Sequence, residues 1–181
     1  MRRLIVPALV SATAFLILVG LGLWQLERLY EKEALLRHID HAVNAAPVPL
    51  PSKAEWSQLK PNDYMYRKVE VTGQFDHAHE AHLFGFIIID ERGTTRPGYF
   101  ILTPLRLADD SYVFVNRGFV PEALKDQAQR RTGLVLGPVT IRGLMRAPEH
   151  KGMFSPDDDL QKNIRFVRDP VLLAESFGLS S

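Results

Sequence analysis

Cysteine is absent from the 181 residues of this chain. Disulfide bonds, thiolate metal sites, iron–sulfur clusters and thiol-based copper carriers all require cysteine, so these classes are excluded. An excess of either charge is also absent, because 22 basic residues face 21 acidic ones and no run of five like charges occurs. Without a basic excess, a nucleic-acid partner is not expected.

Common catalytic signatures are missing as well. We find no nucleophile elbow, phosphate-binding glycine loop, zinc-protease helix or carboxylate pair suited to acid–base chemistry. Asp157, Asp158 and Asp159 form an acidic run, but the alternating oxygen ligands, central glycine and terminal glutamate of an EF-hand loop do not surround it. We therefore expect a binding protein rather than an enzyme, and a solvated turn rather than a calcium site.

The first positive signal is an uncharged stretch at residues 4–23. As a helix rising about 1.5 Å per residue, it crosses a hydrocarbon core of roughly 30 Å, so it predicts a transmembrane helix. A secretory signal peptide is the alternative, because Arg2 and Arg3 form a basic start and Gly20-Leu21-Gly22 is a marginal cleavage site. The lack of a polar region before that site favours a permanent anchor.

The orientation of this helix is weakly indicated by its flanking charges. Arg2 and Arg3 precede it, and Arg28, Lys32 and Arg37 follow it. The two counts are nearly equal, but Arg2 and Arg3 lie directly at the membrane edge. They favour an N-terminus in the cytoplasm and a main domain on the other side.

The helical pattern continues in the stalk to about Val43, with apolar residues spaced three and four apart. Pro47, Pro49 and Pro51 then stop the helix and favour an extended linker. We divide the chain into a cytoplasmic N-terminus at 1–3, a transmembrane helix at 4–23, a helical stalk and proline-rich linker at 24–60, and an extracytoplasmic β-rich domain at 61–181.

Beyond the linker the apolar period changes to two residues, which predicts strands at 67–75, 80–90, 99–106, 112–117 and 139–145. The fourth strand is apolar on both faces, which favours a central position. Short helices are expected at 121–130 and at 170–177, the second stopped by Gly178. The fold class is α+β and mainly β: an N-terminal transmembrane helix followed by a small antiparallel sheet or half-open barrel.

Turn signals separate the expected strands. Gly73 comes too early to end its strand, so we expect a bulge or a close backbone approach there. Arg92-Gly93, Pro97-Gly98 and residues 108–111 are the expected connections, with Asp109 and Asp110 in a hairpin turn.

Several segments also match, in order, the motifs of a known family. They are Gly22-Leu23-Trp24-Gln25-Leu26, Gly73-Gln74-Phe75, Gly98-Tyr99, Thr103-Pro104-Leu105, Val115-Asn116-Arg117-Gly118-Phe119-Val120-Pro121, and the series Gly152, Phe154, Pro156, Asn163 and Arg168-Asp169. In this combination, from about residue 4 to its end, the chain resembles the Surfeit-one cytochrome c oxidase assembly proteins.

The resemblance implies an assembly factor of the bacterial inner membrane with a periplasmic main domain. The family is associated with haem a delivery to, or its insertion in, subunit I of the haem-copper oxidase, so subunit I and the haem a synthesis machinery are the implied partners. Family members usually continue into a second membrane helix that carries the proposed haem-ligating histidine. We expect that helix to be missing after Ser181, so no haem ligand is transferred to this chain. A membrane-tethered interaction domain with no direct haem role is the alternative.

Trp24, Gln25 and Arg28 lie where the first helix leaves the membrane. Lipid anchoring accounts for the aromatic ring and the cation. It gives no reason for Gln25, because an unpaired amide is costly at the hydrocarbon edge. A lipid interface and a partner interface therefore stay open for these three residues.

His77, His79 and His82 are the densest group of metal-ligating side chains. Neutral imidazole binds zinc, copper and haem iron, which makes His77 and His79 candidate metal ligands. These two share a face of a regular strand, but His82 is an odd number of residues away and points to the other face. A turn near Ala78 could regroup them. We favour a solvated strand connection.

Asn116-Arg117-Gly118 has two interpretations. The planar guanidinium of Arg117 could hold a carboxylate such as a haem propionate, so Arg117 is a candidate cofactor contact and, with Asn116, a candidate partner contact. Alternatively, Gly118 permits a bulge or turn, Asn116 tolerates left-handed geometry, and Arg117 pairs with an acid at the strand end. We favour the second interpretation, because glycine at a strand end usually has a backbone purpose.

Overall fold

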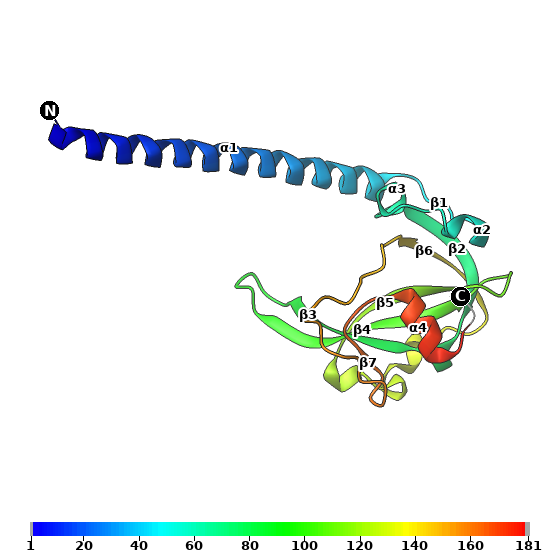
Figure 1. Ribbon diagram of the computed structural model, residues 1–181. Helices are drawn as coiled ribbons and strands as arrows, with labels where there is room; N and C mark the ends of the chain where they lie inside the picture. The colour runs from blue at the N-terminus through cyan, green and yellow to red at the C-terminus, as the bar shows by residue number, and fades with distance from the viewer. Residues whose placement is uncertain (1, 180–181) are drawn as a thin grey trace. The chain divides into compact units, whose positions relative to one another are not determined.

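The computed structural model describes residues 2–179 (Figure 1). The chain divides between Ala46 and Pro47 into two units, an N-terminal helix and a domain built on one sheet. Residues 47–60, predicted to be a proline-rich linker after the stalk, hold the short strand β1, Val48–Pro49, and the short helix α2, Lys53–Trp56. Both belong to the second unit.

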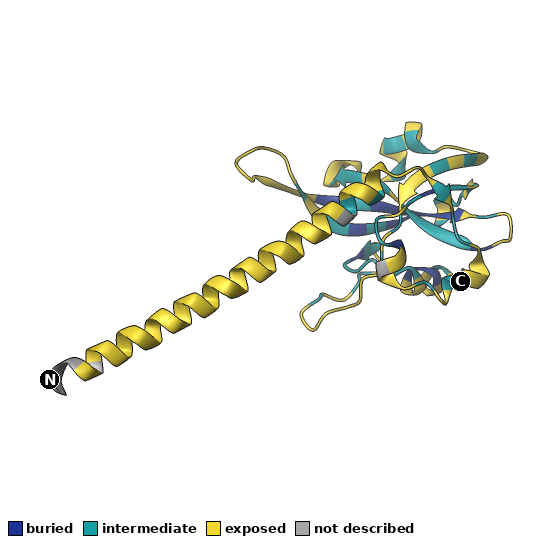
Figure 2. Ribbon diagram, turned by 90° about the horizontal axis from the view of Figure 1, so that it is seen from above, coloured by how far each residue is buried: buried dark blue, intermediate teal, exposed yellow. Residues whose placement is uncertain are grey.

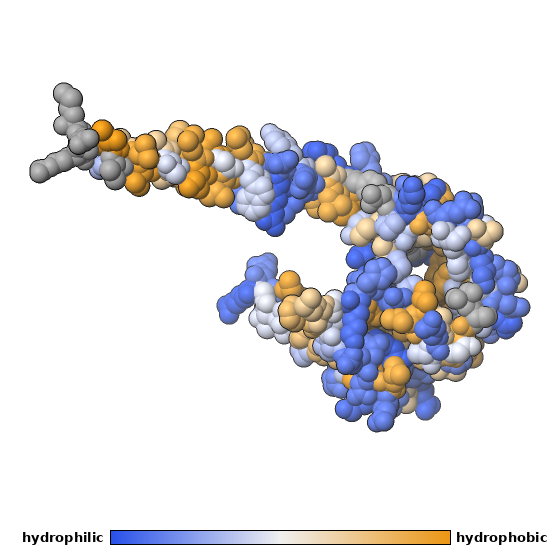
Figure 3. Space-filling model, viewed as in Figure 1, coloured by the Kyte–Doolittle hydropathy of each residue, from blue (hydrophilic) through white to orange (hydrophobic). Residues whose placement is uncertain are grey.

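Helix α1 runs without a break over Arg2–Asn44, which confirms the helical pattern predicted from residue 4 to about Val43. An 18-residue window within Pro7–Asn44 has a mean hydropathy of 2.0, and 0% of that window is buried by protein. Figure 3 shows hydrophobic side chains along its N-terminal half and more hydrophilic ones beyond. Among the described residues, α1 is the one helix long and apolar enough to cross a membrane.

The second unit is a mixed, mainly antiparallel sheet (Figure 1). Its described strands follow the order β1-β2-β4-β3-β7, with β5 paired to β4 and β6 paired to β2. Their bounds are β2 Lys68–Phe75, β3 Ala81–Ile88, β4 Thr95–Arg106, β5 Tyr112–Pro121, β6 Pro138–Leu144 and β7 Ile164–Arg165. Only the short strands β1 and β7 pair in parallel. The mainly β fold class is confirmed, and the sheet does not close into a barrel.

The central strand is β4, which corrects the prediction for residues 112–117. Strand β4 pairs with β3 along one edge and with β5 along the other, whereas β5 pairs only with β4 in the described part of the chain. The apolar residues of β5 have another explanation. Phe114 packs against the core cluster, so packing rather than a central position accounts for this apolar side chain.

Pro97-Gly98 is not a connection, as predicted, but lies inside β4. Proline is tolerated there because pairing with β5 begins only at Gly98 opposite Pro121, so Pro97 has a paired neighbour on one side. A Cβ atom on Gly98 would lie 2.3 Å from the Val120 carbonyl oxygen, which makes glycine a steric requirement. The close approach predicted at Gly73 is confirmed, since a Cβ atom there would lie 2.5 Å from the Arg106 carbonyl oxygen.

The other two connections are turns, as expected. Between β3 and β4, the Gly93 amide donates to the Asp90 carbonyl oxygen at 3.2 Å. Between β4 and β5, Asp110 adopts a left-handed φ of 61°, and Asp109 Oδ1 accepts from the Ser111 amide at 3.1 Å. The side chain of Asp109 thus closes the hairpin turn.

The helix predicted at 121–130 is instead two 3-10 segments, η2 Glu122–Leu124 and η3 Gln127–Gly133. Pro121 still belongs to β5, and Asp126 starts a new segment by accepting from the Ala128 amide at 2.9 Å. The backbone is non-helical at Arg130, whose guanidinium reaches back to the carbonyl oxygen of Leu124. These local contacts interrupt a regular α-helix.

Helix α4, Pro170–Phe177, agrees with its prediction. Asp169 accepts from the Val171 amide at its start, and Gly178, with φ of 65°, ends it. The described chain also has a third 3-10 segment, η1, His77–His79, and a short helix α3, Pro61–Tyr64.

The core lies between the sheet and α4. Ala81 and Leu83 of β3, Leu102 of β4 and Leu173 of α4 form one buried cluster. Figure 2 shows the buried residues in the middle strands of the sheet and in α4, while α1 is exposed along most of its length. Burying a leucine side chain such as Leu102 contributes about 1.5–3 kcal/mol, so this cluster holds α4 on the sheet.

Candidate functional site

The three predicted histidines do not converge on one point. His77 Nε2 lies 2.9 Å from the Val135 carbonyl oxygen, and His79 Nδ1 lies 2.6 Å from Asp76 Oδ2. His82 Nε2 lies 3.1 Å from Glu80 Oε1. Within residues 2–179 no three metal-ligating side chains gather in a way that could hold a metal ion.

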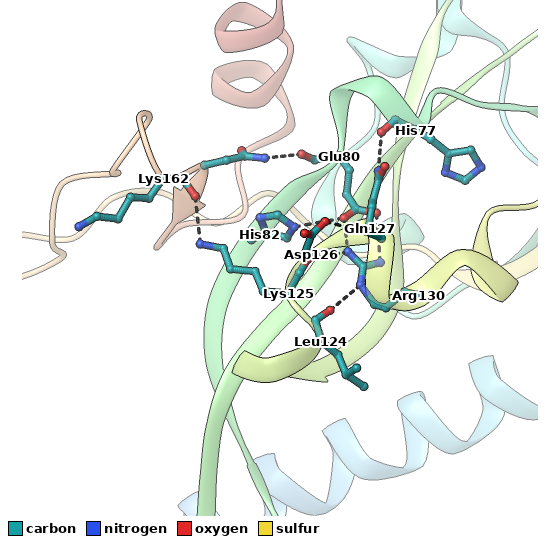
Figure 4. Close-up of polar contacts among 11 residues, drawn as sticks. His77, Glu80, His82, Leu124, Lys125, Asp126, Gln127, Arg130 and Lys162 are labelled. Atoms are coloured by element: carbon teal, nitrogen blue, oxygen red, sulfur yellow. Dashed lines mark hydrogen bonds and ion pairs between the residues drawn. The ribbon is translucent and has the colours of Figure 1, made fainter.

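Glu80, just before β3, is the centre of the densest polar network in the domain (Figure 4). Its side chain is only 3% exposed, and its carboxylate accepts from Arg130 Nη2 at 2.5 Å and from Nη1 at 3.4 Å. Burial raises the pKa of Glu80, but hydrogen bonds from His82 and Arg130 and the Arg130 charge outweigh it and lower the pKa to about 2. Glu80 is therefore a buried carboxylate that stays ionised.

Arg130 also ties Glu80 to the 3-10 segments. Its Nε donates to the Leu124 carbonyl oxygen at 2.6 Å, and its Nη2 donates to that of Lys125 at 2.9 Å. From the other side, Asn163 Nδ2 donates to the Glu80 carbonyl oxygen at 2.6 Å. We call Glu80, His82, Arg130 and Asn163 the Glu80 cluster.

Lys125 and Gln127 hold the same 3-10 segments against neighbouring parts of the domain, and their two hydrogen bonds are drawn in Figure 4. Lys125 Nζ donates to the Lys162 carbonyl oxygen at 3.0 Å and lies 4.8 Å from the centre of the Tyr99 ring. Gln127 Nε2 donates to the His77 carbonyl oxygen at 2.6 Å. The Glu80 cluster thus joins β3, the 3-10 segments and the loop before β7 through paired charges and hydrogen bonds.

Arg117 lies on β5 and is half-buried. Its Nη2 donates to the Gly133 carbonyl oxygen, and its guanidinium carbon lies 4.8 Å from the centre of the Phe75 ring. Burial lowers the pKa of Arg117. Its described contacts are with a carbonyl oxygen and a ring rather than with an acid. Nη2 and one face of the guanidinium therefore already contact the protein.

Asn116 and Gly118 shape a bulge next to Arg117. Pairing between β4 and β5 shifts register between Phe100 and Leu102, and Gly118 has φ of 108°. The exposed Asn116 accepts from the Gly118 amide through Oδ1 at 3.0 Å. Gly118 therefore permits a bulge, as the favoured interpretation of the sequence predicted.

Trp24, Gln25 and Arg28 all lie on α1. The Arg28 guanidinium carbon is 5.5 Å from the centre of the Trp24 ring, one helical turn away, and Trp24 is 49% exposed. Such a cation–π pair presents an aromatic plane and a charge at one position along the helix. Both a lipid headgroup and a partner could use this surface.

The acidic run at 157–159 makes contacts within the fold. Asp157 pairs with Lys151, Asp158 Oδ1 accepts from the Phe166 amide at 2.9 Å, and Asp159 Oδ1 accepts from the Lys162 amide at 3.0 Å. The three carboxylates therefore serve different partners and close the loop before β7.

A sequence profile described as the SURF1 family matches residues 12–181. The chain belongs to the SURF1 family. It is 32% identical over 179 residues to Surfeit locus protein 1 of Rattus norvegicus, covering 93% of this chain and 56% of that protein. For the Mus musculus protein of the same name, identity is 33% over 180 residues, covering 94% and 56%. For the Homo sapiens protein it is 33% over 181 residues, covering 94% and 58%.

This SURF1-family chain spans a little over half the length of those relatives. Many of its family motif residues support the backbone: Gly73 and Gly98 allow close approach, Asn116 and Gly118 form the bulge, and Asn163 binds the Glu80 carbonyl oxygen. Sequence reasoning missed Glu80 and Arg130. The two residues are 50 positions apart, so no local pattern connects them.

Proposed function

We propose that this SURF1-family protein is a membrane-anchored assembly factor for haem-copper cytochrome c oxidase, and that it assists haem a delivery to, or its insertion in, subunit I. The observation that carries the proposal is the family motif string along nearly the whole chain, joined to a helix that exposes its apolar residues. The role is binding rather than catalysis, in keeping with a sequence that lacks the common catalytic signatures.

We place the protein in the bacterial inner membrane, with the N-terminus in the cytoplasm and the sheet domain in the periplasm. Arg2 and Arg3 at the membrane edge support this orientation. Because the chain has no cysteine, the orientation can be tested with Leu136→Cys, a site 85% exposed in the domain. In intact cells with a permeabilised outer membrane, a membrane-impermeant maleimide should label it. Labelling only after lysis would contradict a periplasmic domain.

A haem a group would require an axial ligand and partners for its propionates. Arg117 offers a guanidinium, but its Nη2 already donates to Gly133. His77, His79 and His82 each contact a protein oxygen through one ring nitrogen, and the other ring nitrogen of His77 and of His82 is buried within the domain, out of reach of an iron atom. These residues do not fit a ready haem site. We therefore favour a factor that holds subunit I in a haem-accepting state over one that carries haem itself.

The same histidine contacts favour a second candidate, a membrane-tethered interaction domain with no direct haem role. To separate the candidates, we would delete the gene in a haem-a-producing host and measure haem a and subunit I in purified oxidase. Subunit I that accumulates without haem a supports the assembly role, and restoration by the expressed chain is the control. Oxidase with full haem a content in the deletion strain would contradict it.

A visible spectrum of the protein purified from the same membranes tests direct haem carriage. We expect subunit I to co-purify with the factor, and we expect the factor freed of subunit I to show no absorbance band of haem a. A stoichiometric haem a spectrum on the factor alone would favour carriage over holding subunit I.

A further inference from the structure

The loop between β6 and β7 carries the two most exposed large hydrophobic residues of the described chain. Met153 is 92% exposed and Phe154 is 94% exposed. They occupy the corner of a tight turn in which the Ser155 amide donates to the Gly152 carbonyl oxygen at 3.1 Å. Turn corners usually carry glycine, proline, asparagine, aspartate or serine, so a methionine and a phenylalanine there are unusual.

The turn is held in place by contacts at the base of its loop. The Gly152 amide donates to Ser155 Oγ at 3.0 Å, and Lys151 pairs with Asp157 across the base. Further down, Glu149 pairs with Arg168. The exposed side chains therefore stand on a closed loop, with an ion pair behind them and no charge at residues 152–156.

We infer that the turn Gly152-Met153-Phe154-Ser155 enters the interfacial region of the lipid bilayer and gives the domain a membrane contact of its own, in addition to helix α1. An uncharged tip with two large apolar side chains loses water-exposed apolar surface on entering that region. The pair between Lys151 and Asp157 keeps the opposing charges together just behind the tip.

We propose the bilayer as the partner of this turn because α1 limits how far the domain can move from the membrane. This step rests on the proposed membrane anchor. The stalk after residue 23 extends to Asn44. At about 1.5 Å per residue its reach is about 30 Å. A domain of this size is about 35–40 Å across, so a surface loop can meet the membrane within that reach.

Another exposed apolar segment, the hairpin of β3 and β4, differs at its tip. The hairpin of β3 and β4 exposes Phe86 and Ile88, by 57% and 71%. Its turn holds Asp90, Glu91 and Arg92, and charged side chains are costly to move into hydrocarbon. The 152–155 turn has no such charges and is the better candidate of these two for insertion.

The absence of cysteine permits a direct test on the full-length chain. We would label Met153→Cys with an environment-sensitive fluorophore and reconstitute the protein in vesicles of phosphatidylethanolamine and phosphatidylglycerol. Leu136→Cys is the matched control, since Leu136 is a large apolar residue, 85% exposed, elsewhere in the domain. We expect nitroxide-lipid quenching at position 153 to exceed that at 136 severalfold, with the reverse order for aqueous iodide.

A second variant tests the mechanism. Adding Phe154→Asp to the labelled Met153→Cys protein should return the label to water, while the melting temperature of the domain stays unchanged because both side chains are exposed. Equal iodide quenching at 153 and 136 would overturn the inference while leaving the anchor intact. Protection at 153 that requires added oxidase would also overturn it, in favour of a protein contact. A chain that stays in the soluble fraction would contradict the anchor and the inference together.

Discussion

The Glu80 cluster buries a charged side chain, whereas helix α1 exposes apolar side chains. Glu80 is a charged group that is only 4% exposed, whereas Leu16 of α1 is an apolar residue that is 68% exposed. Charge inside a protein is tolerated when it is paired and hydrogen-bonded, as Arg130 and His82 do for Glu80. Apolar surface outside needs an apolar solvent, which a bilayer supplies. The domain therefore depends on partners within the chain, and α1 depends on its surroundings.

Arg130→Met should have the most severe effect on the domain. It leaves the Glu80 carboxylate buried without its main cation, which costs about 3–5 kcal/mol of folding free energy. The matched control is Arg142→Met, because Arg142 pairs with Glu70 on the surface and its side chain is 69% exposed. That change should cost less than about 1 kcal/mol. Denaturant unfolding followed by Trp56 fluorescence measures both, and equal losses would show that burial of the pair is not decisive.

Leu16→Lys tests the other side of the comparison. A lysine in the middle of the apolar span opposes membrane insertion by roughly 2.5–3.5 kcal/mol. We expect a smaller fraction of the protein to resist carbonate extraction from membranes. Leu36→Lys, at a stalk residue that is 65% exposed, should leave that fraction unchanged. Identical extraction of the two variants would argue against a membrane span at residues 4–23.

The pKa of Glu80 predicts acid sensitivity of the domain. Its folded pKa is about 2, lowered from 4.5, so its contribution is fully present above about pH 4.5 and is lost as pH falls through that value towards 2. The loss amounts to roughly 3 kcal/mol. Unfolding free energy measured between these pH values should fall less steeply in Glu80→Gln. An unchanged slope would assign the acid sensitivity to other carboxylates.

Arg117→Ala should have the mildest effect. Losing its hydrogen bond to Gly133 and its contact with Phe75 removes about 1 kcal/mol from a half-exposed site. If Arg117 only supports the fold, haem a content of the co-purified oxidase should stay normal when the variant is present at full abundance. Reduced haem a content at normal abundance would instead indicate a propionate clamp, and Arg117→Lys would show whether the planar fork is needed.

Local signals explain which elements the sequence predicted well. Helix α4 was found at its observed bounds because Asp169, Pro170 and Gly178 mark its ends. Strand β2 was found because its two-residue period covers one continuous segment. The bulge at Gly118 and the close approach at Gly73 could also be predicted from the sequence, because glycine inside or at the end of a strand usually marks such a feature.

The errors arose where distant residues decide the outcome. The helix expected at 121–130 is divided because the Arg130 side chain binds the carbonyl oxygens of Leu124 and Lys125 as well as Glu80 on the sheet. Strand β5 looked central from its apolar faces, yet strand order depends on which edges pair. For the candidate site, the histidines were visible in the sequence, but their separate partners were not.

The sequence by itself determined the apolar span, the long helix, the change from helix to strands after the linker, and the family. Each of these depends only on contiguous residues or on motifs in a fixed order. Only the tertiary structure decided that β4 is central, that Glu80 pairs with Arg130, and that Met153 and Phe154 stand uncovered. Pairing and exposure depend on which distant segments come together in space. No local period or spacing carries that information.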